Sequence, residues 1–219
     1  MTSSRSYGQA CPVAHALDMI GERWAMLIVR ELRLGPRRYV DLQASLPGLS
    51  PSVLAQRLRD LERVGVLRRR TLPAPAASRI YELTEWGAEL EPVFTALAKW
   101  GMRSPVVPLE GGLTPDSVML GMSTFFDGSA DPAWTATYQL RLERDNYLVR
   151  VEGGRLAELV RDEARGPVDA TVETDIGTLL AVQSGDESLE AAAQAGRLTL
   201  AGDAQAVRRL LAAAVPDSS

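Results

Sequence analysis

The sequence predicts two consecutive domains: a mainly α-helical domain that contains a β-hairpin, and an α+β domain with an antiparallel sheet and helices on one face. Three observations lead to this fold class. Apolar residues recur at helical spacing through much of the first half, and they alternate as in strands in the second half. A segment rich in proline and glycine separates the halves. We therefore expect domains at residues 1–104 and 113–219, joined by a linker at residues 105–112.

The length and composition are those of a globular protein. A chain of 219 residues can bury two cores, and 46% hydrophobic with 24% charged residues is an ordinary balance for folded domains. No apolar run approaches the roughly 18 residues that a membrane-spanning helix needs, and the first ten residues lack the apolar core of a secretion signal. We expect a cytoplasmic protein without membrane insertion.

The charge is distributed unevenly between the two halves. Residues 1–104 carry 15 Lys and Arg against 10 Asp and Glu, whereas residues 105–219 carry 9 against 18. The overall net charge of −4 therefore combines a basic first half with an acidic second half. This asymmetry indicates that only the first half meets a polyanion.

Catalytic and metal-binding signatures are missing from the sequence. With one cysteine and one histidine, the chain can form neither an intramolecular disulfide nor a Cys/His zinc site. It contains no G-x-S-x-G, P-loop or G-x-G-x-x-G motif. The pair Asp162 and Glu163 has the chemistry for acid–base work, but nothing in the sequence puts it in a cleft. We expect no enzyme, no metal and no cofactor.

The first half reads as helices followed by a hairpin. Apolar spacing predicts helices at residues 12–21, 22–32, 39–48 and 50–65. Two strands then follow at residues 66–72 and 78–84, joined by a proline-rich loop. A helix, a short turn, a second helix and a hairpin are the order of a winged helix-turn-helix domain.

The helix that starts at Ser50 has two different faces. Ser50 is a suitable N-cap and Pro51 suits the first helical position. One face predicts a buried stripe, which consists of Leu54, Leu58, Leu61 and Val64. The opposite face is polar and positive, and consists of Ser52, Gln56, Arg59 and Arg63.

This polar face is either a solvated surface or a surface that reads double-stranded DNA, and the winged-helix context favours DNA. The helix would lie in the major groove with Ser52, Gln56, Arg59 and Arg63 near base edges. Gln56 could bond adenine bidentately and Arg59 could bond guanine. Other arginines suit phosphates, which position a protein without specifying sequence: Arg37, Arg38, Arg57, Arg68, Arg69, Arg70 and Arg79.

The first half also resembles a known family. CPVAHALDMIGERWAMLIVREL, GPRRYVDLQASLPGLSPSVLAQRLRDLERVGVLRR and YELTEWGAELEPVFTALAKWG look like the HxlR-type winged-helix regulators, which are related to the MarR regulators. The likeness covers about residues 11–101. It implies a homodimer in which the terminal helices pack across a two-fold axis.

A stripe on the last helix of this half agrees with a dimer. Its apolar residues are more than one small domain would cover: Leu90, Val93, Phe94, Leu97 and Trp100. A symmetric dimer would read an inverted repeat as its operator.

Cys11 has two interpretations. It comes just before a predicted helix N-terminus, where the helix dipole favours a thiolate, and His15 lies one turn further on. Some members of the family that it resembles use a cysteine here as a redox or electrophile sensor. The alternative is a small residue that packs at the helix start.

The second half alternates as a β-meander. Residues 117–128 have helical spacing, and the segment 134–160 then alternates, with turns expected at Asp145-Asn146 and Gly153-Gly154. A strand at 168–175, two helices, another strand and a last helix complete the pattern. Strands backed by helices indicate an α+β layer.

This half resembles the sterol-carrier-protein family over about residues 113–215. The likeness rests on DATVETDIGTLLAVQSG and SLEAAAQAGRLTLAGDAQAVRRLL, and it implies an apolar tunnel for a small molecule or lipid. Candidate lining residues, each of which could instead be plain core, are Met119, Met122, Phe125, Phe126, Leu179, Leu180 and Leu189.

Together these features predict a dimeric transcriptional regulator, a repressor, controlled by an apolar ligand in the second domain. One alternative is a redox or electrophile-sensing regulator that acts through Cys11. The other is a lipid-binding or scaffold protein whose winged domain serves only dimerisation. The sequence leaves the operator, the ligand and the regulated genes open.

Overall fold

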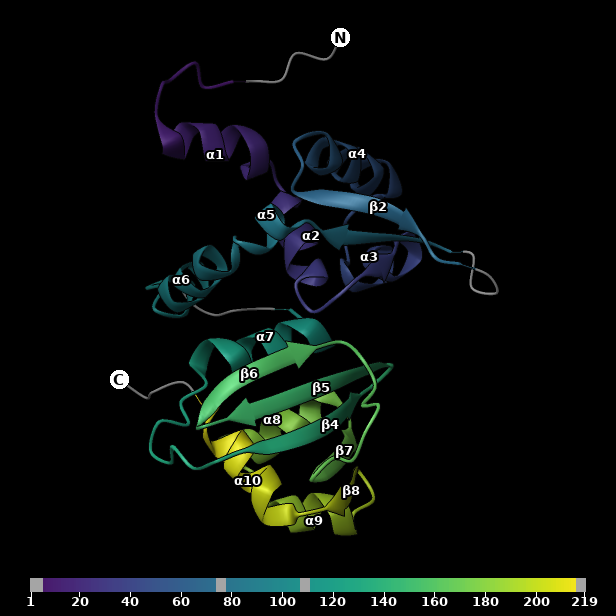
Figure 1. Cartoon of the computed structure of the whole chain (residues 1–219), viewed down its shortest axis with the longest axis vertical. Helices are drawn as coiled ribbons and strands as arrows, with labels where there is room; N and C mark the ends of the chain where they lie inside the picture. Colours follow the sequence, from purple (N-terminus) through teal and green to yellow (C-terminus); the bar gives the residue numbers. More distant parts are fainter. Residues whose placement is uncertain (1–5, 74–77, 107–110, 216–219) are drawn as a thin grey trace. The chain divides into compact units, whose positions relative to one another are not determined.

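The computed structural model describes residues 6–73, 78–106 and 111–215 (Figure 1). The chain divides into two compact units, of which the first ends at Phe94 and the second begins at Thr95. The predicted domain limits at 104 and 113 stay predictions, because residues 107–110 lie outside the described part. Among the described residues, no helix combines the length and the apolar content that crossing a bilayer requires.

Helices dominate the first unit. In chain order its elements are α1 (Pro12–Ile20), α2 (Ala25–Leu32), β1 (Arg37–Arg38), α3 (Tyr39–Ser45), α4 (Pro51–Arg63), β2 (Leu67–Thr71), β3 (Arg79–Leu83) and α5 (Glu85–Ala88). Helix α6 (Glu91–Met102) follows, and the division between the units falls within it. The helices and the hairpin expected from the sequence are present, and residues 74–77 of the proline-rich loop lie outside the described residues.

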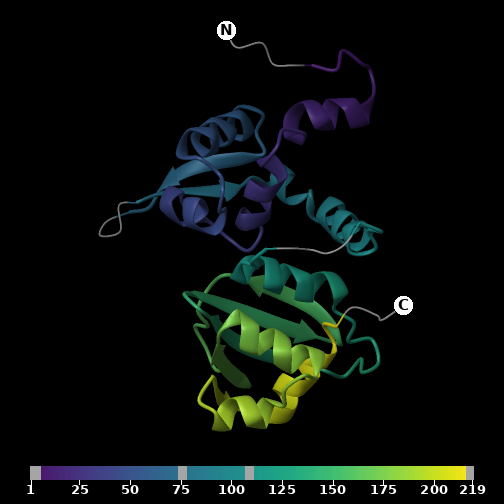
Figure 2. The same ribbon diagram turned by 180° about the vertical axis from the view of Figure 1, so that it is seen from behind.

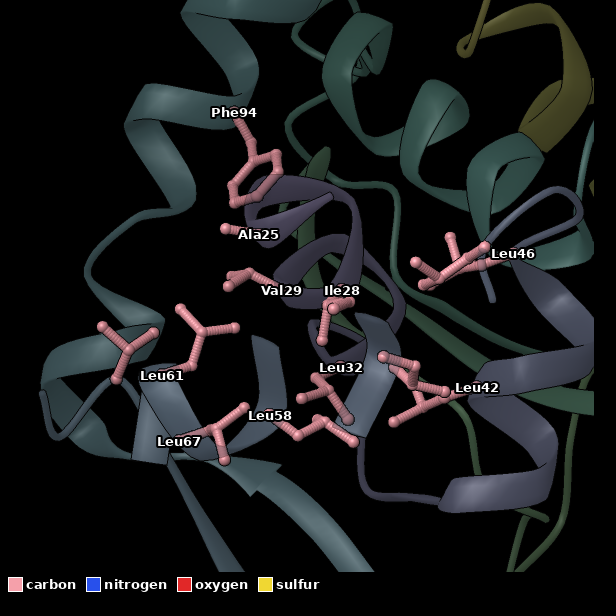
Figure 3. Close-up of a cluster of buried hydrophobic side chains, with 13 residues drawn as sticks. Ala25, Ile28, Val29, Leu32, Leu42, Leu46, Leu58, Leu61, Leu67 and Phe94 are labelled. Atoms are coloured by element: carbon pink, nitrogen blue, oxygen red, sulfur yellow. The ribbon is translucent and has the colours of Figure 1, made fainter. Parts of the chain in front are cut away.

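The core of the first unit forms where α2, α3 and α4 converge (Figure 3). Leu54, Leu58 and Leu61 of α4 are buried, which confirms three members of the predicted stripe, while Val64 is half-buried. Residues Ile28 and Leu32 of α2, Leu42 of α3 and Leu67 of β2 pack into the same cluster. Burial of these aliphatic side chains holds α4 in a fixed position on the domain.

A small antiparallel sheet of order β1-β3-β2 completes the unit. Arg37 pairs with Tyr81 and Arg38 with Ile80, so β1 extends the hairpin by a third strand. The sequence did not predict β1. A two-residue strand has no room for an alternating pattern, and only its pairing with β3 defines it.

The second unit is an α+β domain. Its elements are α7 (Pro115–Phe125), β4 (Ala136–Leu142), β5 (Asp145–Glu152), β6 (Arg155–Val160), β7 (Ala170–Thr174), α8 (Ile176–Ser184), α9 (Leu189–Gln194), β8 (Leu198–Gly202) and α10 (Ala204–Ala212). The five strands form one sheet of order β6-β5-β4-β7-β8.

This sheet is mixed, which corrects the expectation of an antiparallel sheet. Strands β4 and β7 run parallel, with Tyr138 opposite Ala170 and Leu142 opposite Thr174. After β6 the chain crosses back to the far side of β4, and Gln139 of β4 fixes this crossing. Its amide nitrogen donates to the Asp162 carbonyl (3.3 Å) and its oxygen accepts from the Ala164 amide (2.7 Å).

The predicted turn between β4 and β5 lies two residues too late in the chain. Leu142 pairs with Asp145, so the turn consists of Glu143 and Arg144, and Asp145 with Asn146 already belongs to β5. Glu143 has a left-handed φ of 57°. Aspartate and asparagine are common turn residues, but here the strand register decides the turn.

One face of the sheet is buried and the other is polar. Tyr138, Leu140, Tyr147, Val149 and Val172 alternate along their strands and are all buried. The intervening positions carry charged side chains such as Arg150 and Glu173, both exposed. The prediction of helices on one face fits this division, and Figure 2 views the sheet from the side that α8 covers.

Buried charges lie beneath helix α7. The Asp116 carboxylate, in the first turn of α7, pairs with Arg161 and accepts a hydrogen bond from the Tyr147 hydroxyl (2.6 Å). Asp116 is fully buried, and its partners satisfy the charge that burial would otherwise penalise. Burial, followed by the Asp116 charge, raises the pKa of Tyr147 far above its usual range.

Candidate nucleic-acid interface

The start of α4 is held by side chains on both sides of the turn that precedes it. Ser50 caps the helix by accepting from the Val53 amide (3.4 Å). The Tyr39 hydroxyl of α3 donates to the Pro51 carbonyl (2.7 Å), and the Gln43 amide donates to the Leu49 carbonyl (2.5 Å). These bonds from α3 fix the direction in which α4 leaves the turn.

The outer face of α4 presents polar and basic side chains to solvent. Ser52, Arg59 and Arg63 are exposed, and Gln56 is half-buried. Arg59 donates from Nη2 to Oε1 of Gln56 (2.7 Å), and Nε2 of Gln56 donates to Oδ1 of Asp60 (2.9 Å). The predicted base-reading residues therefore lie together on one helix face, and two of them are linked to each other.

Two arginines that were predicted to contact phosphates are covered or paired within the domain. Arg37 is only 8% exposed. The Arg57 side chain, 20% exposed, donates to Asp60 (3.1 Å) and lies 3.7 Å from Glu22. A phosphate contact for Arg37 or Arg57 stays a prediction, and the burial of Arg37 and the ion pairs of Arg57 count against it. Their positions in the sequence gave no sign of this burial.

The hairpin of β2 and β3 carries the run of three arginines (Figure 1). Arg68 and Arg70 lie on the same face of β2, and both donate to Glu82 of β3, at 2.7 Å and 3.0 Å. The hydrogen bond from Arg70 lowers the pKa of the Glu82 carboxyl most, burial opposes this, and the hydrogen bond from Arg68 lowers the pKa further. Two of the three positive charges are thereby partly balanced.

The other basic side chains of this surface are exposed, and two of them lie farther from an acidic group than Arg68 and Arg70 do. Arg69 points to the opposite face of β2, where its nearest acid is Glu62 at 3.9 Å. Arg38 is exposed and lies 3.9 Å from Asp41, and Arg79 is exposed at the start of β3. The surface therefore keeps exposed guanidiniums on α4, on β2 and at the start of α3.

Sequence reasoning missed the acids of this surface, Asp60 and Glu82, which look like ordinary surface charges along the chain. The signal for Glu82 was its register, because a hairpin that pairs Arg68 with Glu82 puts these side chains on the same face. The signal for Asp60 was its spacing of four from Gln56 and three from Arg57 on one helix.

Comparison with known proteins identifies this unit. Residues 19–105 match the model of the HxlR-like helix-turn-helix family. The HTH-type transcriptional regulator sll1512 of Synechocystis sp. is 39% identical over 94 residues, which is 43% of this chain and 70% of that one. The chain belongs to the HxlR-like helix-turn-helix family.

Two further similar proteins are a curated relative and a solved structure. The HTH-type transcriptional regulator YodB of Bacillus subtilis is 36% identical over 91 residues, covering 41% of this chain and 81% of its own. A solved structure titled as the redox regulator HypR in its oxidised form has 30% identity and a TM-score of 0.42, and it covers 44% of this chain and all of that one. The relatives from Synechocystis and Bacillus subtilis are named as transcriptional regulators, so the first unit is the winged helix-turn-helix of an HxlR-type transcriptional regulator.

The second unit has a different family match. Residues 113–216 match the model of the alkyl sulfatase C-terminal family. The likeness to sterol-carrier proteins stays a prediction. The HxlR-like model matches residues 19–105, so the second unit lies outside the HxlR match.

The HxlR unit also leaves apolar side chains uncovered near its terminal helices. On α6, Val93, Leu97 and Trp100 are exposed, the last at 69%. Phe94 is instead buried in the core of its own unit, and Leu90 is half-buried. The predicted stripe is therefore shared between the core and the surface.

Cys11 lies at the N-cap of α1 and is exposed. Backbone N–H groups of Ala14 and then Val13 lower the pKa of its thiol. The His15 amide donates to the Cys11 carbonyl (2.9 Å) in the first turn of the helix, and the His15 side chain is exposed. In the described ranges, no three His, Cys, Asp or Glu side chains gather in a way that could hold a metal ion.

The predicted ligand residues divide by burial. Met119, Met122, Leu179 and Leu189 are buried, whereas Phe125, Phe126 and Leu180 are half-buried. Leu180 lines an open hollow of about 470 Å³ together with Ala181 and Val215. A second hollow, of about 660 Å³ beside Trp134 and α10, is lined by none of the predicted residues.

Proposed function

We propose that this HxlR-type regulator is a homodimeric repressor that binds an inverted-repeat operator in double-stranded DNA. Helix α4 of each subunit enters the major groove, with Ser52, Arg59 and Arg63 toward base edges. Phosphates are contacted by Arg38, Arg69 and Arg79. Arg68 and Arg70 also contact phosphates, with the positive charge that Glu82 does not neutralise. The proposed site of action is the cytoplasm.

One observation carries this proposal: a buried, capped helix exposes arginines on the face that points away from the domain. Leu54, Leu58 and Leu61 fix α4 in the core, while Arg59 and Arg63 are exposed on its outer side. A rigid helix with a hydrogen-bonding, positive outer surface is suited to the major groove, whose base edges offer acceptors to guanidinium groups.

The experiment that tests DNA binding is selection of duplexes from a random pool with the full chain. A regulator enriches one sequence with two related half-sites about one helical turn apart. Its affinity falls steeply with salt, since each phosphate contact releases counterions. Weak binding with neither enrichment nor a salt slope would instead support the scaffold alternative.

The dimer of this proposal uses α6. Val93, Leu97 and Trp100 expose large apolar surface on one terminal helix, and burial against a second copy would remove this surface from water. A two-fold pair also explains why an operator would be an inverted repeat.

Control by an apolar ligand is the part of the proposal that concerns the second unit. Met119 and Met122 lie among the buried side chains of an α+β domain, and methionine adapts to varied apolar shapes. Ligand binding would shift the equilibrium between operator-bound and free dimers, a coupling of about 1–3 kcal/mol in typical cases. Mass spectrometry of small molecules that copurify with the chain tests this, and a chain without any such molecule speaks against it.

The second candidate function is thiol sensing, which the environment of Cys11 favours. Its thiol is exposed and its pKa is lowered, so a larger fraction is thiolate, the reactive form. Oxidation or electrophile addition at Cys11 would then release the operator. Under this candidate, Cys11→Ser abolishes the response to oxidant or quinone and leaves basal DNA binding intact.

A further inference from the structure

Gln56 is a half-buried amide whose two ends are both occupied within α4. Its Nε2 donates to Oδ1 of Asp60 at 2.9 Å, and its Oε1 accepts from Nη2 of Arg59 at 2.7 Å. A carboxylate can only accept and a guanidinium can only donate, so these neighbours fix the orientation of the amide. The amide lies along the helix surface between Arg59 and Asp60.

Asp60 is itself held in position from the other side. Its second oxygen, Oδ2, accepts from Nη1 of Arg57 at 3.1 Å, and Nη2 of Arg57 lies 3.7 Å from Glu22, before α2 begins. Only 20% of the Arg57 side chain and 29% of the Asp60 side chain are exposed. The chain of contacts therefore runs from Glu22 through the largely covered Arg57 and Asp60 to Gln56, and ends at the exposed Arg59.

We propose that Gln56 and Asp60 are positioning residues that aim Arg59 at one base pair, and that Gln56 does not itself read a base. This inference rests on the proposed DNA-binding function and deepens it.

The chemistry of the two side chains supports this division of roles. A bidentate contact with adenine needs both the oxygen and the amino group of a glutamine aimed at the base. In Gln56 the oxygen is turned to Arg59 and the amino group to Asp60. Arg59 has five N–H donors and uses one of them on Gln56, which leaves enough for a bidentate contact with O6 and N7 of guanine.

The arrangement also limits the freedom of a long side chain. An arginine loses considerable rotamer entropy when it is fixed on DNA, and a hydrogen bond that already restrains the guanidinium reduces this loss. We call the contacts from Asp60 through Gln56 to Arg59 the relay. The relay favours binding where the base pair suits the restrained Arg59, so it contributes to sequence specificity at that base pair.

The test uses the full chain and the duplex that the wild-type protein enriches from a random pool. Each position of this duplex is changed to the other three base pairs, and affinity is measured for the variants Arg59→Ala, Gln56→Ala, Asp60→Ala and Asp60→Asn. Arg59→Ala is expected to lose about tenfold discrimination at one position. Gln56→Ala and Asp60→Ala are expected to lose part of it at that same position.

Two comparisons separate positioning from a structural role. Asp60→Asn keeps an oxygen that accepts from Gln56, so it is expected to retain most of the discrimination that Asp60→Ala loses. The double variant Arg59→Ala with Asp60→Ala is expected to lose no more discrimination than Arg59→Ala alone, because both changes remove one interaction. Glu85→Ala is the control, since it removes an exposed acid of the same unit that is not in contact with Gln56, Arg59 or Asp60 in any hydrogen bond or ion pair described above.

The outcomes distinguish this inference from the proposed function. The inference is overturned when Gln56→Ala loses preference at a different base pair from Arg59→Ala, because Gln56 then reads a base itself. Equal weakening on all duplexes by Gln56→Ala and Asp60→Ala also overturns it, since this is the mark of a structural role. When the wild-type protein enriches no duplex, the DNA-binding function itself fails and the relay fails with it.

Discussion

Glu82 is a single carboxylate that balances two of the three arginines on the hairpin. Its side chain is only 12% exposed, and it accepts from Arg68 and Arg70 across the β2–β3 pair. The charge that the hairpin offers to DNA is therefore smaller than the sequence RRR suggests. This effect belongs to one residue, so one substitution tests it.

Replacement of Glu82 by glutamine is expected to raise the affinity for all duplexes alike. The change removes the negative charge next to Arg68 and Arg70, and both guanidiniums then become available to phosphates. The slope of log affinity against log salt is expected to steepen by about one unit for each additional phosphate that these guanidiniums neutralise. Fluorescence anisotropy over a salt series measures both quantities.

Glu85→Gln provides the control for this prediction, because Glu85 is an exposed acid on the neighbouring α5. It changes the net charge by the same amount without freeing an arginine. Equal effects of the two substitutions would mean that net charge, and not release of Arg68 and Arg70, changes the affinity.

The same carboxylate predicts a pH dependence of stability. Because Arg70 and Arg68 lower the pKa of Glu82 in the folded protein, its ionised form is favoured by folding. This contribution is complete above the unfolded-state pKa, about 4.3, and is lost as pH falls through the lower folded-state pKa. Urea unfolding between about pH 7 and pH 3 is expected to give converging free energies of unfolding for the wild type and Glu82→Gln as the pH falls. A gap of constant size over this range would contradict the prediction.

At the scale of elements, α6 has more apolar side chains than its own unit covers. Its Phe94 packs into the core of the first unit, but Val93, Leu97 and Trp100 remain exposed on the same helix. One helix thus has one apolar position that its own unit covers and several that a second copy would have to cover.

Leu97→Glu is therefore expected to convert the dimer to a monomer. The substitution introduces a charge into surface that the proposed interface would desolvate, and burying an unpaired charge is strongly unfavourable. Analytical ultracentrifugation is expected to give half the wild-type mass with an unchanged circular dichroism spectrum. Affinity for the two-half-site duplex should fall, while Lys99→Ala, on the same helix, should change neither measurement. A Leu97→Glu protein that sediments as a dimer would rule out this interface.

At the scale of the whole molecule, the two units have separate cores. Leu58 is 1% exposed in the cluster that joins α2, α3 and α4, and Leu140 is 3% exposed on the buried face of the five-stranded sheet. Each unit has buried apolar residues of its own. Their stabilities should therefore respond to different substitutions.

Hydrogen exchange tests this separation. A buried Leu→Ala change costs about 2–5 kcal/mol, so Leu58→Ala is expected to speed exchange of amides up to Phe94 and to leave those of β4, β5 and β7 near wild-type rates. Leu140→Ala is expected to have the opposite pattern. Peptide-resolved mass spectrometry measures both, and a uniform acceleration in either variant would mean that the units unfold as one.

The sequence was most informative where local pattern and burial agree. In α4 the cap at Ser50, the proline that follows and the stripe of Leu54, Leu58 and Leu61 all indicate the same helix, and the structure has it. The alternation around Tyr138 and Tyr147 likewise predicted strands β4 and β5. Such features depend on neighbours in the chain, which the sequence lists directly.

Local sequence patterns could not predict which residues pair when they are distant in the chain. Alternation is the same for parallel and antiparallel neighbours, so the parallel pair of β4 and β7 was missed, and the turn at Glu143 depends on a register that only the sheet defines. The burial of Arg37 and Arg57 likewise depends on which elements pack around them.

By itself, the sequence determined the order of elements, the basic first half and the polar outer face of α4, because these follow from periodicity and charge along the chain. The tertiary structure decided which arginines remain available, because Glu82 reaches Arg68 and Arg70, and Glu22 reaches Arg57, only when the chain has folded. An ion pair depends on distance in space, and a sequence carries that distance only for residues on the same helix or strand.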